Sequence, residues 1–419
     1  MINRLLTLFL FVSWCSFSLF SQPIRNNNQI FNNPTPGEIT IMAVNPIPDD
    51  VTPTREAFKE VVDCGFNLAT SRGTVSYFKN IFSILGDLKL KYLISSPNFI
   101  DQATRKSYIS AFQNNAHLGG WLLKDEPAFS TFNSLSLQYK AFYKEDPNHL
   151  IYINLVGAIN NNFTGDCKTV KDYLNLFQNK FSPSLWSYDY YPFIIRKGKL
   201  EVLYDQFYND LEDFSYMAKK TSRPFWAFCE GLAYETKSYS RPAATEPYLK
   251  FAAYNALAYG AQGIVYWTYS LRKSSETSKY TSALVDLNGK KTKAWFDAQK
   301  VNQQIIKFND VFYQCDVKEV KHTGNTKYKG TTKLKGSIGP LKSVISGPAG
   351  VLVSRIENNG GKYIVIVNHD PFNNQKITLK LNPGKSVVNL TSDRQPRYSG
   401  SGNINITLDK ADWLIMKEI

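Results

Sequence analysis

Eight short apolar segments recur along the chain, and their spacing constrains the fold more than any other feature. The intervals between them are roughly 25 to 40 residues, the length of one strand–helix repeat. Each segment is nearly continuous in apolar residues, as expected for a parallel strand that is covered on both faces. The segments are residues 39–44, 66–69, 92–95, 119–123, 150–155, 185–188, 224–228 and 263–267. Eight such units predict a closed α/β barrel, the TIM (β/α)8 barrel.

Helical signals fall between these segments. Residues 54–64 open with Thr54 and stop at Gly65, and the Ala-rich residues 246–259 stop at Gly260. An open, doubly wound sheet is the alternative fold. No glycine-rich phosphate loop follows the first apolar segment, which favours the barrel.

The pattern changes after about residue 309, where alternation with a period of two replaces the helical period. Residues 351–356 and 363–368 flank Asn-Asn-Gly-Gly, which predicts a hairpin with a tight turn. Alternating segments continue at residues 376–381, 387–390, 404–408 and 412–417. We therefore predict a barrel over residues 22–310 and a small antiparallel β-sandwich over residues 311–419. We expect the sandwich to support the barrel structurally, and the alternative is that it binds carbohydrate.

The N-terminus has the pattern of a secretory signal peptide. A short basic head precedes an apolar run over residues 5–20, and small residues follow near Ser21. The run is shorter than the ~20 residues of a spanning helix, which disfavours a membrane anchor. Cys15 follows Val-Ser-Trp, a poor match to a lipoprotein cleavage box. We therefore expect residues 1–21 to be removed and the protein to be secreted or periplasmic, with a surface lipoprotein the less favoured alternative.

Composition argues against several classes of partner. The formal charge is +14, but the lysines are dispersed, so we predict no nucleic-acid partner. An acidic glycan or an anionic cell surface is an alternative partner. No later stretch is long enough to span a membrane, and the sequence carries no signal for an oligomeric state. The cysteines beyond the leader and the histidines are Cys64, Cys167, Cys229, Cys315, His117, His149, His322 and His369. Their spacing matches no metal site, so we predict neither a metal nor another cofactor.

Two glutamates follow apolar segments at corresponding places. Glu126 comes after the fourth segment and Glu230 after the seventh. A barrel of this kind carries its chemistry at the C-terminal ends of its strands. A proton donor and a carboxylate on opposite sides of the barrel mouth are what cleavage of a glycosidic bond requires. Asp125 would raise the pKa of Glu126, and Pro127 disfavours a helical conformation there. The alternatives are a solvated loop at Glu126 and an arginine-paired strand end at Glu230.

Other strand ends supply polar and aromatic groups for the same site. We expect Arg72 to keep the carboxylate nucleophile ionised, a tyrosine to position Glu230, and Trp267 to pack under a pyranose ring. Asp189 and two asparagines would bind sugar hydroxyls. For each residue alone, ordinary packing is the alternative; together they describe a cleft that suits a neutral sugar. The candidate binding residues are Asn45, Arg72, Asn98, Asp125, Asp189, Tyr190, Tyr191 and Trp267.

Residues 120–127, 226–231 and 248–269 resemble glycoside hydrolase clan A, the retaining barrel enzymes that include β-galactosidases, β-mannanases and cellulases. The resemblance implies a carbohydrate substrate, with Glu126 as acid/base, Glu230 as nucleophile and a glycosyl-enzyme intermediate. Many members have Asn before the acid/base, whereas this chain has Asp125. A permutation with Asp125 as the acid is therefore an alternative. A non-catalytic glycan-binding barrel and another barrel hydrolase or lyase are the other functions considered.

Overall fold

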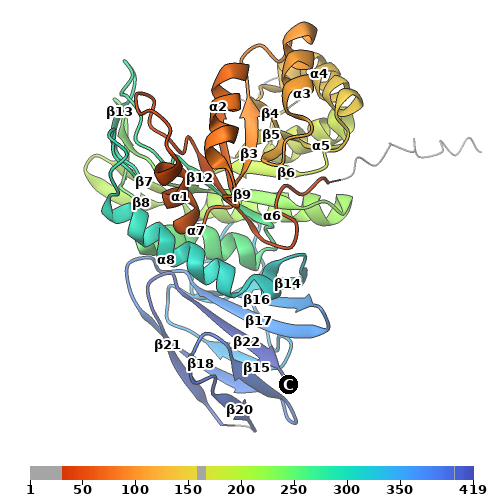
Figure 1. Ribbon diagram of the computed structural model, residues 1–419. Helices are drawn as coiled ribbons and strands as arrows, with labels where there is room; N and C mark the ends of the chain where they lie inside the picture. Colours follow the sequence, from red (N-terminus) through yellow and green to blue (C-terminus); the bar gives the residue numbers. More distant parts are fainter. Residues whose placement is uncertain (1–30, 158–166, 401) are drawn as a thin grey trace, which may run out of the picture.

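The computed structural model describes residues 31–157, 167–400 and 402–419. Residues 1–21, over which a signal peptide is predicted, lie outside this range. Over the described residues, a closed barrel of parallel strands with surrounding helices is followed by antiparallel β sheets (Figure 1). The predicted fold class is confirmed.

The barrel contains one strand for each of the eight predicted apolar segments. The order around the barrel is β1-β12-β9-β6-β5-β4-β3-β2. All seven residues of β5 and all six of β9 are buried, because helices cover the outer face and side chains fill the bore. The strands are β1 Thr40–Val44, β2 Leu68–Arg72, β3 Lys91–Ser95, β4 Leu118–Asp125, β5 Leu150–Val156, β6 Trp186–Asp189, β9 Phe225–Glu230 and β12 Gly263–Trp267.

The helices connect these strands around the outside of the barrel. The first begins as predicted, because the Thr54 side chain accepts a hydrogen bond from the Ala57 amide at 3.2 Å. The helices are α1 Arg55–Asp63, α2 Val75–Leu85, α3 Gln102–Phe112, α4 Phe132–Glu145 after the 3-10 turn Phe129–Thr131, α5 Val170–Phe181, α6 Tyr204–Thr221, α7 Glu246–Ala258, α8 Lys293–Lys307 and the short α9 Asn309–Phe312.

A second sheet, not anticipated from the sequence, is built from the loops that follow three barrel strands. We call it the mouth sheet; it has the order β13-β10-β11-β7-β8. Its strands β7, β8 and β13 lie together on one side of the barrel (Figure 1). Because each loop leaves a strand at its C-terminal end, the mouth sheet adjoins the barrel opening. The strands are β7 Phe193–Arg196, β8 Lys199–Val202, β10 Ala233–Glu235, β11 Ser240–Arg241 and β13 Lys279–Ser282.

The C-terminal region consists of two antiparallel sheets, ordered β14-β16-β17-β22-β19-β20 and β15-β18-β21 over the described residues. An apolar cluster that includes Val353, Ile366, Leu379 and Met416 lies between them. In the predicted hairpin, Asn359 and Gly360 form the turn with φ of 46° and 76°. The strands are β14 Asp316–His322, β15 Leu341–Ile345, β16 Val351–Asn358, β17 Gly361–Asn368, β18 Gln375–Leu381, β19 Ser386–Asn389, β20 Arg397–Ser399, β21 Ile404–Leu408 and β22 Trp413–Glu418.

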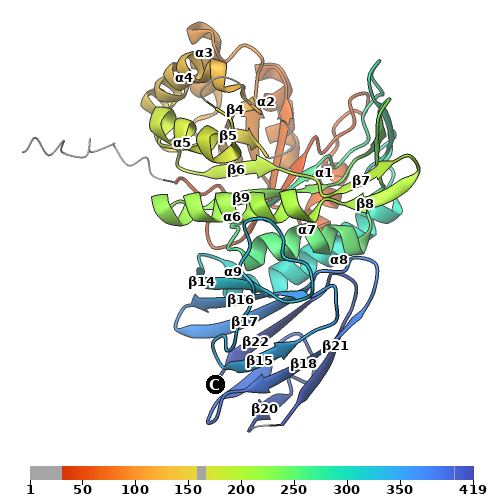
Figure 2. The same ribbon diagram turned by 180° about the vertical axis from the view of Figure 1, so that it is seen from behind.

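The larger C-terminal sheet packs against barrel helices, with α7 and α8 between the barrel strands and the sheets (Figure 2). The Trp413 ring stacks 3.7 Å from the Tyr254 ring, measured between centroids. Losing such a buried tryptophan typically costs about 3–5 kcal/mol of stability.

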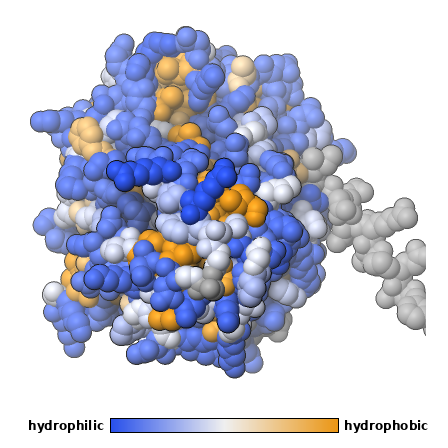
Figure 3. Space-filling view, turned by 90° about the horizontal axis from the view of Figure 1, so that it is seen from below, coloured by the Kyte–Doolittle hydropathy of each residue, from blue (hydrophilic) through white to orange (hydrophobic). Residues whose placement is uncertain are grey.

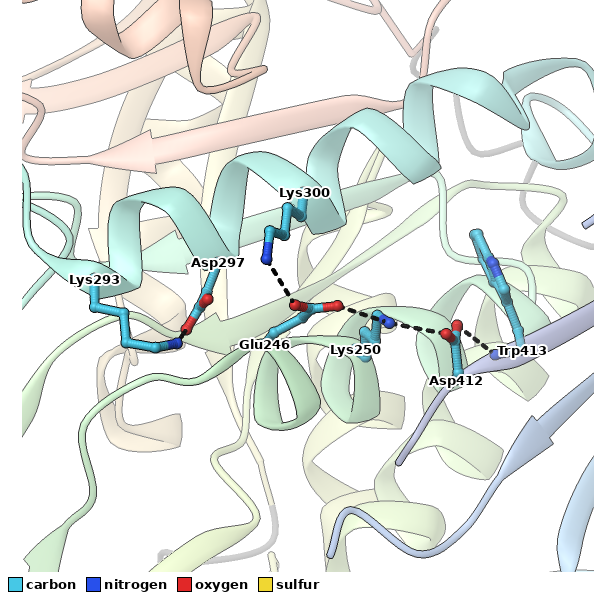
Figure 4. Close-up of polar contacts among 7 residues, drawn as sticks. All are labelled: Glu246, Lys250, Lys293, Asp297, Lys300, Asp412 and Trp413. Carbon is cyan, nitrogen blue, oxygen red and sulfur yellow. Dashed lines mark hydrogen bonds and ion pairs between the residues drawn. The ribbon is translucent and has the colours of Figure 1, made fainter. Parts of the chain in front are cut away.

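One ion pair of a small network crosses the same contact. Lys250 of α7 lies 2.8 Å from Asp412 of the C-terminal region (Figure 4). Within the barrel helices, Glu246 lies 2.9 Å from Lys250 and 3.4 Å from Lys300. Seen from the C-terminal end, the surface is mainly hydrophilic with separated hydrophobic patches (Figure 3). None of the helices in the described part of the chain has the length and hydropathy of a membrane span.

Candidate active site

Two cavities that share a wall open at the C-terminal ends of the barrel strands. The first, of about 240 Å³, is lined by Arg72 and Arg272 among others, and we call it the arginine cavity. The second, of about 250 Å³, is lined by Glu126 and Asp189, and we call it the carboxylate cavity. Asp125 and Trp267 line both, so these two residues form the shared wall. Ends of several barrel strands thus contribute to one site, as in other barrels of this kind.

Glu126 occupies a strained turn at the end of β4. Its φ is 42°, in the left-handed region that costs a non-glycine residue about 1–3 kcal/mol. The Glu126 amide donates to the Asn154 carbonyl at 2.9 Å. The Tyr173 hydroxyl donates to the Pro127 carbonyl at 2.8 Å. These bonds hold the turn in place, and the Glu126 side chain stays exposed at the barrel mouth.

Asn154, in the middle of β5, connects the two acidic residues of this turn. Its side-chain amide donates to Asp125 Oδ1 at 3.0 Å, while its backbone carbonyl holds Glu126. The Ser187 hydroxyl donates to Asn154 Oδ1 at 3.0 Å and lies 2.7 Å from the Tyr152 hydroxyl. Asn154 is not among the site residues predicted from the sequence. An amide inside the otherwise apolar run of residues 150–156 was the available signal.

Three carboxyl groups gather in the carboxylate cavity. Although Glu126 is exposed at the barrel mouth, it lies against the cavity wall, and this partial loss of solvent together with the charge of Asp125 raises its pKa. Burial, together with the charges of Glu126 and Asp125, raises the pKa of Asp189 well above its usual value. The side chains of Glu126 and Asp189 both line this cavity, and each influences the pKa of the other. Such a pair titrates as a unit and keeps one proton to higher pH than an isolated carboxyl group does.

Glu230, the last residue of β9, lies in a different environment. It is 9% exposed and does not line either cavity. Its Oε1 lies 3.7 Å from Nε of Arg241, which lines the carboxylate cavity. Arg241 Nη1 donates to the Phe193 carbonyl at 2.6 Å, which fixes the guanidinium. Burial raises the pKa of Glu230 to about 8, and the positive charge of Arg241 opposes that shift.

The structure brings most of the predicted binding residues to the two cavities. Asn45 lines the arginine cavity, and Tyr190 and Tyr191 line the carboxylate cavity. The Tyr191 ring lies 5.9 Å from that of Trp267, between centroids. Asn98 is not brought in: it lies in an exposed turn beyond the end of β3, because the chain turns outward there toward α3.

Arg72 reaches a different partner from the predicted one. Burial raises the pKa of Asp125, and the charge of Arg72 is among the influences that oppose this rise. Arg241 is the arginine beside Glu230. Three residues of this site escaped the sequence analysis because they come from the mouth sheet and its turn: Tyr234, Tyr239 and Arg241. No local pattern marks them. Within residues 31–157, 167–400 and 402–419, no group of three or more His, Cys, Asp or Glu side chains is arranged to hold a metal ion.

Comparisons with known proteins agree with this architecture. The family model of glycoside hydrolase family 42, described as β-galactosidase, matches residues 122–308. A catalytic mutant of Gan42B, a family 42 β-galactosidase from G. stearothermophilus, shares the fold with a TM-score of 0.59. It is 8% identical, over 91% of this chain and 98% of that one. A family 5 glycoside hydrolase from Bacteroides vulgatus has a TM-score of 0.55 at 10% identity, over 91% and 89%. No curated protein sequence matches.

The barrel with its C-terminal β sheets is that of the clan A glycoside hydrolases. Within this class, the chain is a family 42-like glycosidase, and its substrate is therefore a carbohydrate. The matched residues run from within β4 to just beyond α8 and include both glutamates.

Proposed function

We propose that the protein is a retaining glycosidase for β-linked glycans, with Glu126 as acid/base and Glu230 as nucleophile. The observation that carries this proposal is the contrast between the neighbours of the two strand-end glutamates. Glu126 lies among carboxyl groups that help it to hold a proton. Burial raises the pKa of Glu230 to about 8, and the Arg241 guanidinium at 3.7 Å opposes that rise, so the carboxylate that attacks the sugar is formed mainly above neutral pH. The family description makes β-galactosides the first substrates to test.

The reaction would proceed in two displacements. Glu230 attacks the anomeric carbon while Glu126 gives its proton to the departing glycosidic oxygen, leaving a glycosyl ester on Glu230. Water then attacks the anomeric carbon and displaces the Glu230 carboxylate, while the Glu126 carboxylate takes up a proton from the water. Because Glu230 is nearly buried against Arg241, its carboxylate must turn toward the cavities to reach the sugar. Trp267, on the shared wall, offers an apolar face to the pyranose ring.

Trapping the intermediate tests the assignment directly. A glycosyl donor with fluorine beside the anomeric carbon and a good leaving group forms the ester but hydrolyses slowly. We expect a covalent adduct whose mass maps to the peptide that contains Glu230. Glu230→Gln should give no adduct, whereas Glu235→Gln, an exposed glutamate on β10, should behave as wild type. An active enzyme whose adduct maps to a peptide without Glu230 would contradict the assignment of the nucleophile. A product with inverted anomeric configuration would contradict the retaining mechanism.

Turnover of two variants distinguishes Glu126 from Asp125 as the acid/base. If Glu126 is the acid/base, Asp125→Asn keeps turnover, because it places the residue that many clan A enzymes have at this position. If Asp125 is the acid instead, Asp125→Asn loses turnover on poor leaving groups and Glu126→Gln retains it.

We further propose that the protein is exported, with residues 1–21 as the signal peptide. The basis is the charge and apolar pattern of that segment alone. Expressed with its own N-terminus in a bacterial host, the exported protein should begin near Ser21 or Gln22 by mass spectrometry. Leu8→Arg, which interrupts the apolar run, should leave uncleaved precursor. An exported wild type that retains Met1 would contradict cleavage.

A further inference from the structure

The arginine cavity is lined by two cationic groups that form no ion pair within the described part of the chain. Arg72 ends β2, and Arg272 lies in the segment that follows β12. Among the described residues, neither guanidinium donates a hydrogen bond or has a carboxylate within 4 Å. Arg72 is exposed and Arg272 is half-buried, so both line the cavity where solvent and a ligand reach them. Two arginine side chains that line one cavity offer hydrogen-bond donors and positive charge to an anion.

The buried arginines of the described chain differ from this pair because protein groups hold them. Arg105 binds Glu145 through two nitrogens, at 2.9 Å each, and Arg241 binds two backbone carbonyls beside Glu230. Asp125 is the acidic residue that lines the arginine cavity, and it is already held by Asn154 at 3.0 Å. Burial raises the pKa of Asp125, and the charge of Arg72 is among the influences that oppose this rise without an ion pair. The donors of both cavity arginines therefore stay available.

The rest of the cavity wall suits a sugar that carries an anionic group. Asn45 and Ser71 provide polar side chains, and Trp267 provides an aromatic face. Carboxylate and sulfate groups match the planar fork of a guanidinium, which binds them through paired hydrogen bonds. The net charge of +14 adds attraction at longer range, because a cationic protein concentrates an anionic polymer around itself.

We propose that the arginine cavity binds a sugar unit bearing a carboxylate or sulfate group, so that the natural substrate is an anionic glycan. This substrate class rests on the glycosidase function proposed above, with the cleaved bond lying toward Asp125 and Glu126. This proposal differs from the sequence-based expectation of a neutral sugar, which followed from the acids, aromatics and amides at the strand ends. The difference arises because Arg72 and Arg272 line the same cavity.

Matched pairs of substrates test the proposal. One arm compares an aryl β-glucuronide with the aryl β-glucoside and a polyuronide with its carboxyl-reduced form. The other arm compares an aryl β-galactoside sulfated at its primary hydroxyl with the unsulfated compound, and a sulfated galactan with its desulfated form. The first arm reports a carboxylate, and the second a sulfate. The key variant is Arg72→Gln/Arg272→Gln. Its matched control is Arg394→Gln/Arg397→Gln, which removes the same charge from exposed positions of the C-terminal region.

We expect the wild type to favour the anionic member of at least one pair by about tenfold or more in kcat/KM, the scale of one charged hydrogen bond. The cavity variant should lose this preference, and the control should keep it. Hydrolysis with equal or better rates on the neutral member of every pair would overturn the proposal and leave the glycosidase function standing. A preference that persists in the cavity variant would also overturn it.

Binding keeps the test independent of turnover. If no substrate of the panel is cleaved, the proposed function fails for these linkages, and calorimetry with the same oligosaccharides decides the inference. Tighter binding of an anionic member, lost in the cavity variant but not in the control, supports an anion-binding cavity. No binding of any anionic member overturns it.

Discussion

Glu126 and Glu230 occupy equivalent places in the barrel, each at the end of a strand, yet their surroundings differ in three respects. Glu126 is exposed, has a positive φ and lies among other carboxyl groups. Glu230 is 9% exposed and has Arg241 at 3.7 Å. The barrel brings both acids to one face, and the loops supply the neighbours that divide their roles. The difference shows that the catalytic role of a strand-end carboxyl group in this fold depends on the residues that surround it.

The largest effect is expected from Glu230→Gln. The amide cannot form a glycosyl ester, so turnover should fall by about 10³-fold or more on every substrate, activated aryl glycosides included. Steady-state rates across leaving groups measure this, with circular dichroism as the check on folding. Comparable losses on good and poor leaving groups are the signature of a nucleophile. A loss confined to poor leaving groups would reverse the two roles.

Glu126→Gln should show the opposite dependence. Without a proton donor, cleavage of poor leaving groups should slow by about 10²–10⁴-fold, the usual contribution of general acid catalysis. Aryl glycosides with acidic phenols need little protonation and should retain most of the first step. A plot of log kcat/KM against leaving-group pKa should therefore be steeper for the variant than for the wild type. An unchanged slope would remove Glu126 from the acid role.

Arg241→Gln sharpens the comparison at the other glutamate. Removing the positive charge raises the pKa of Glu230 further above about 8, so less of the carboxylate is ionised at neutral pH. The acid limb of the kcat/KM profile should move to higher pH, with roughly tenfold lower activity at pH 7 for a shift of about one unit. Arg241→Lys keeps a positive charge, so its acid limb should lie between those of the wild type and Arg241→Gln. Equal loss at all pH values would indicate a structural role for Arg241 instead.

The smallest effect is expected from Asp189→Asn. Without the second carboxyl group, like-charge repulsion no longer raises the pKa at which the Glu126–Asp189 pair loses its last proton. The alkaline limb should therefore move to lower pH, by about one unit or less, while the acid limb stays in place. Asp213→Asn, a substitution on α6 away from both cavities, is the matched control. If the acid limb moved instead, Asp189 would be influencing the pKa of Glu230 and not that of Glu126.

Much of the fold was predictable because its signals are local. The apolar runs, the Thr54 cap and the Asn-Gly turn of the C-terminal hairpin each act within a few residues, and each appears where expected. The mouth sheet was not predictable. Its strands are two to four residues long and pair loops from three different repeats, so no single segment carries its pattern.

The sequence by itself determined that two glutamates follow barrel strands. Because all strands of such a barrel are parallel, their C-terminal ends, and therefore both glutamates, lie at the same face. Tertiary structure decided their neighbours. Pairing of β4 with β5 places Asn154 beside Asp125, and the hairpin of β10 and β11 turns Arg241 back onto Glu230. Arg72 was expected at the nucleophile but lies instead near Asp125, in the cavity that it shares with Arg272. These contacts depend on strand pairing and on how the loops fold over the barrel mouth, so no local sequence pattern sets the distances between the residues.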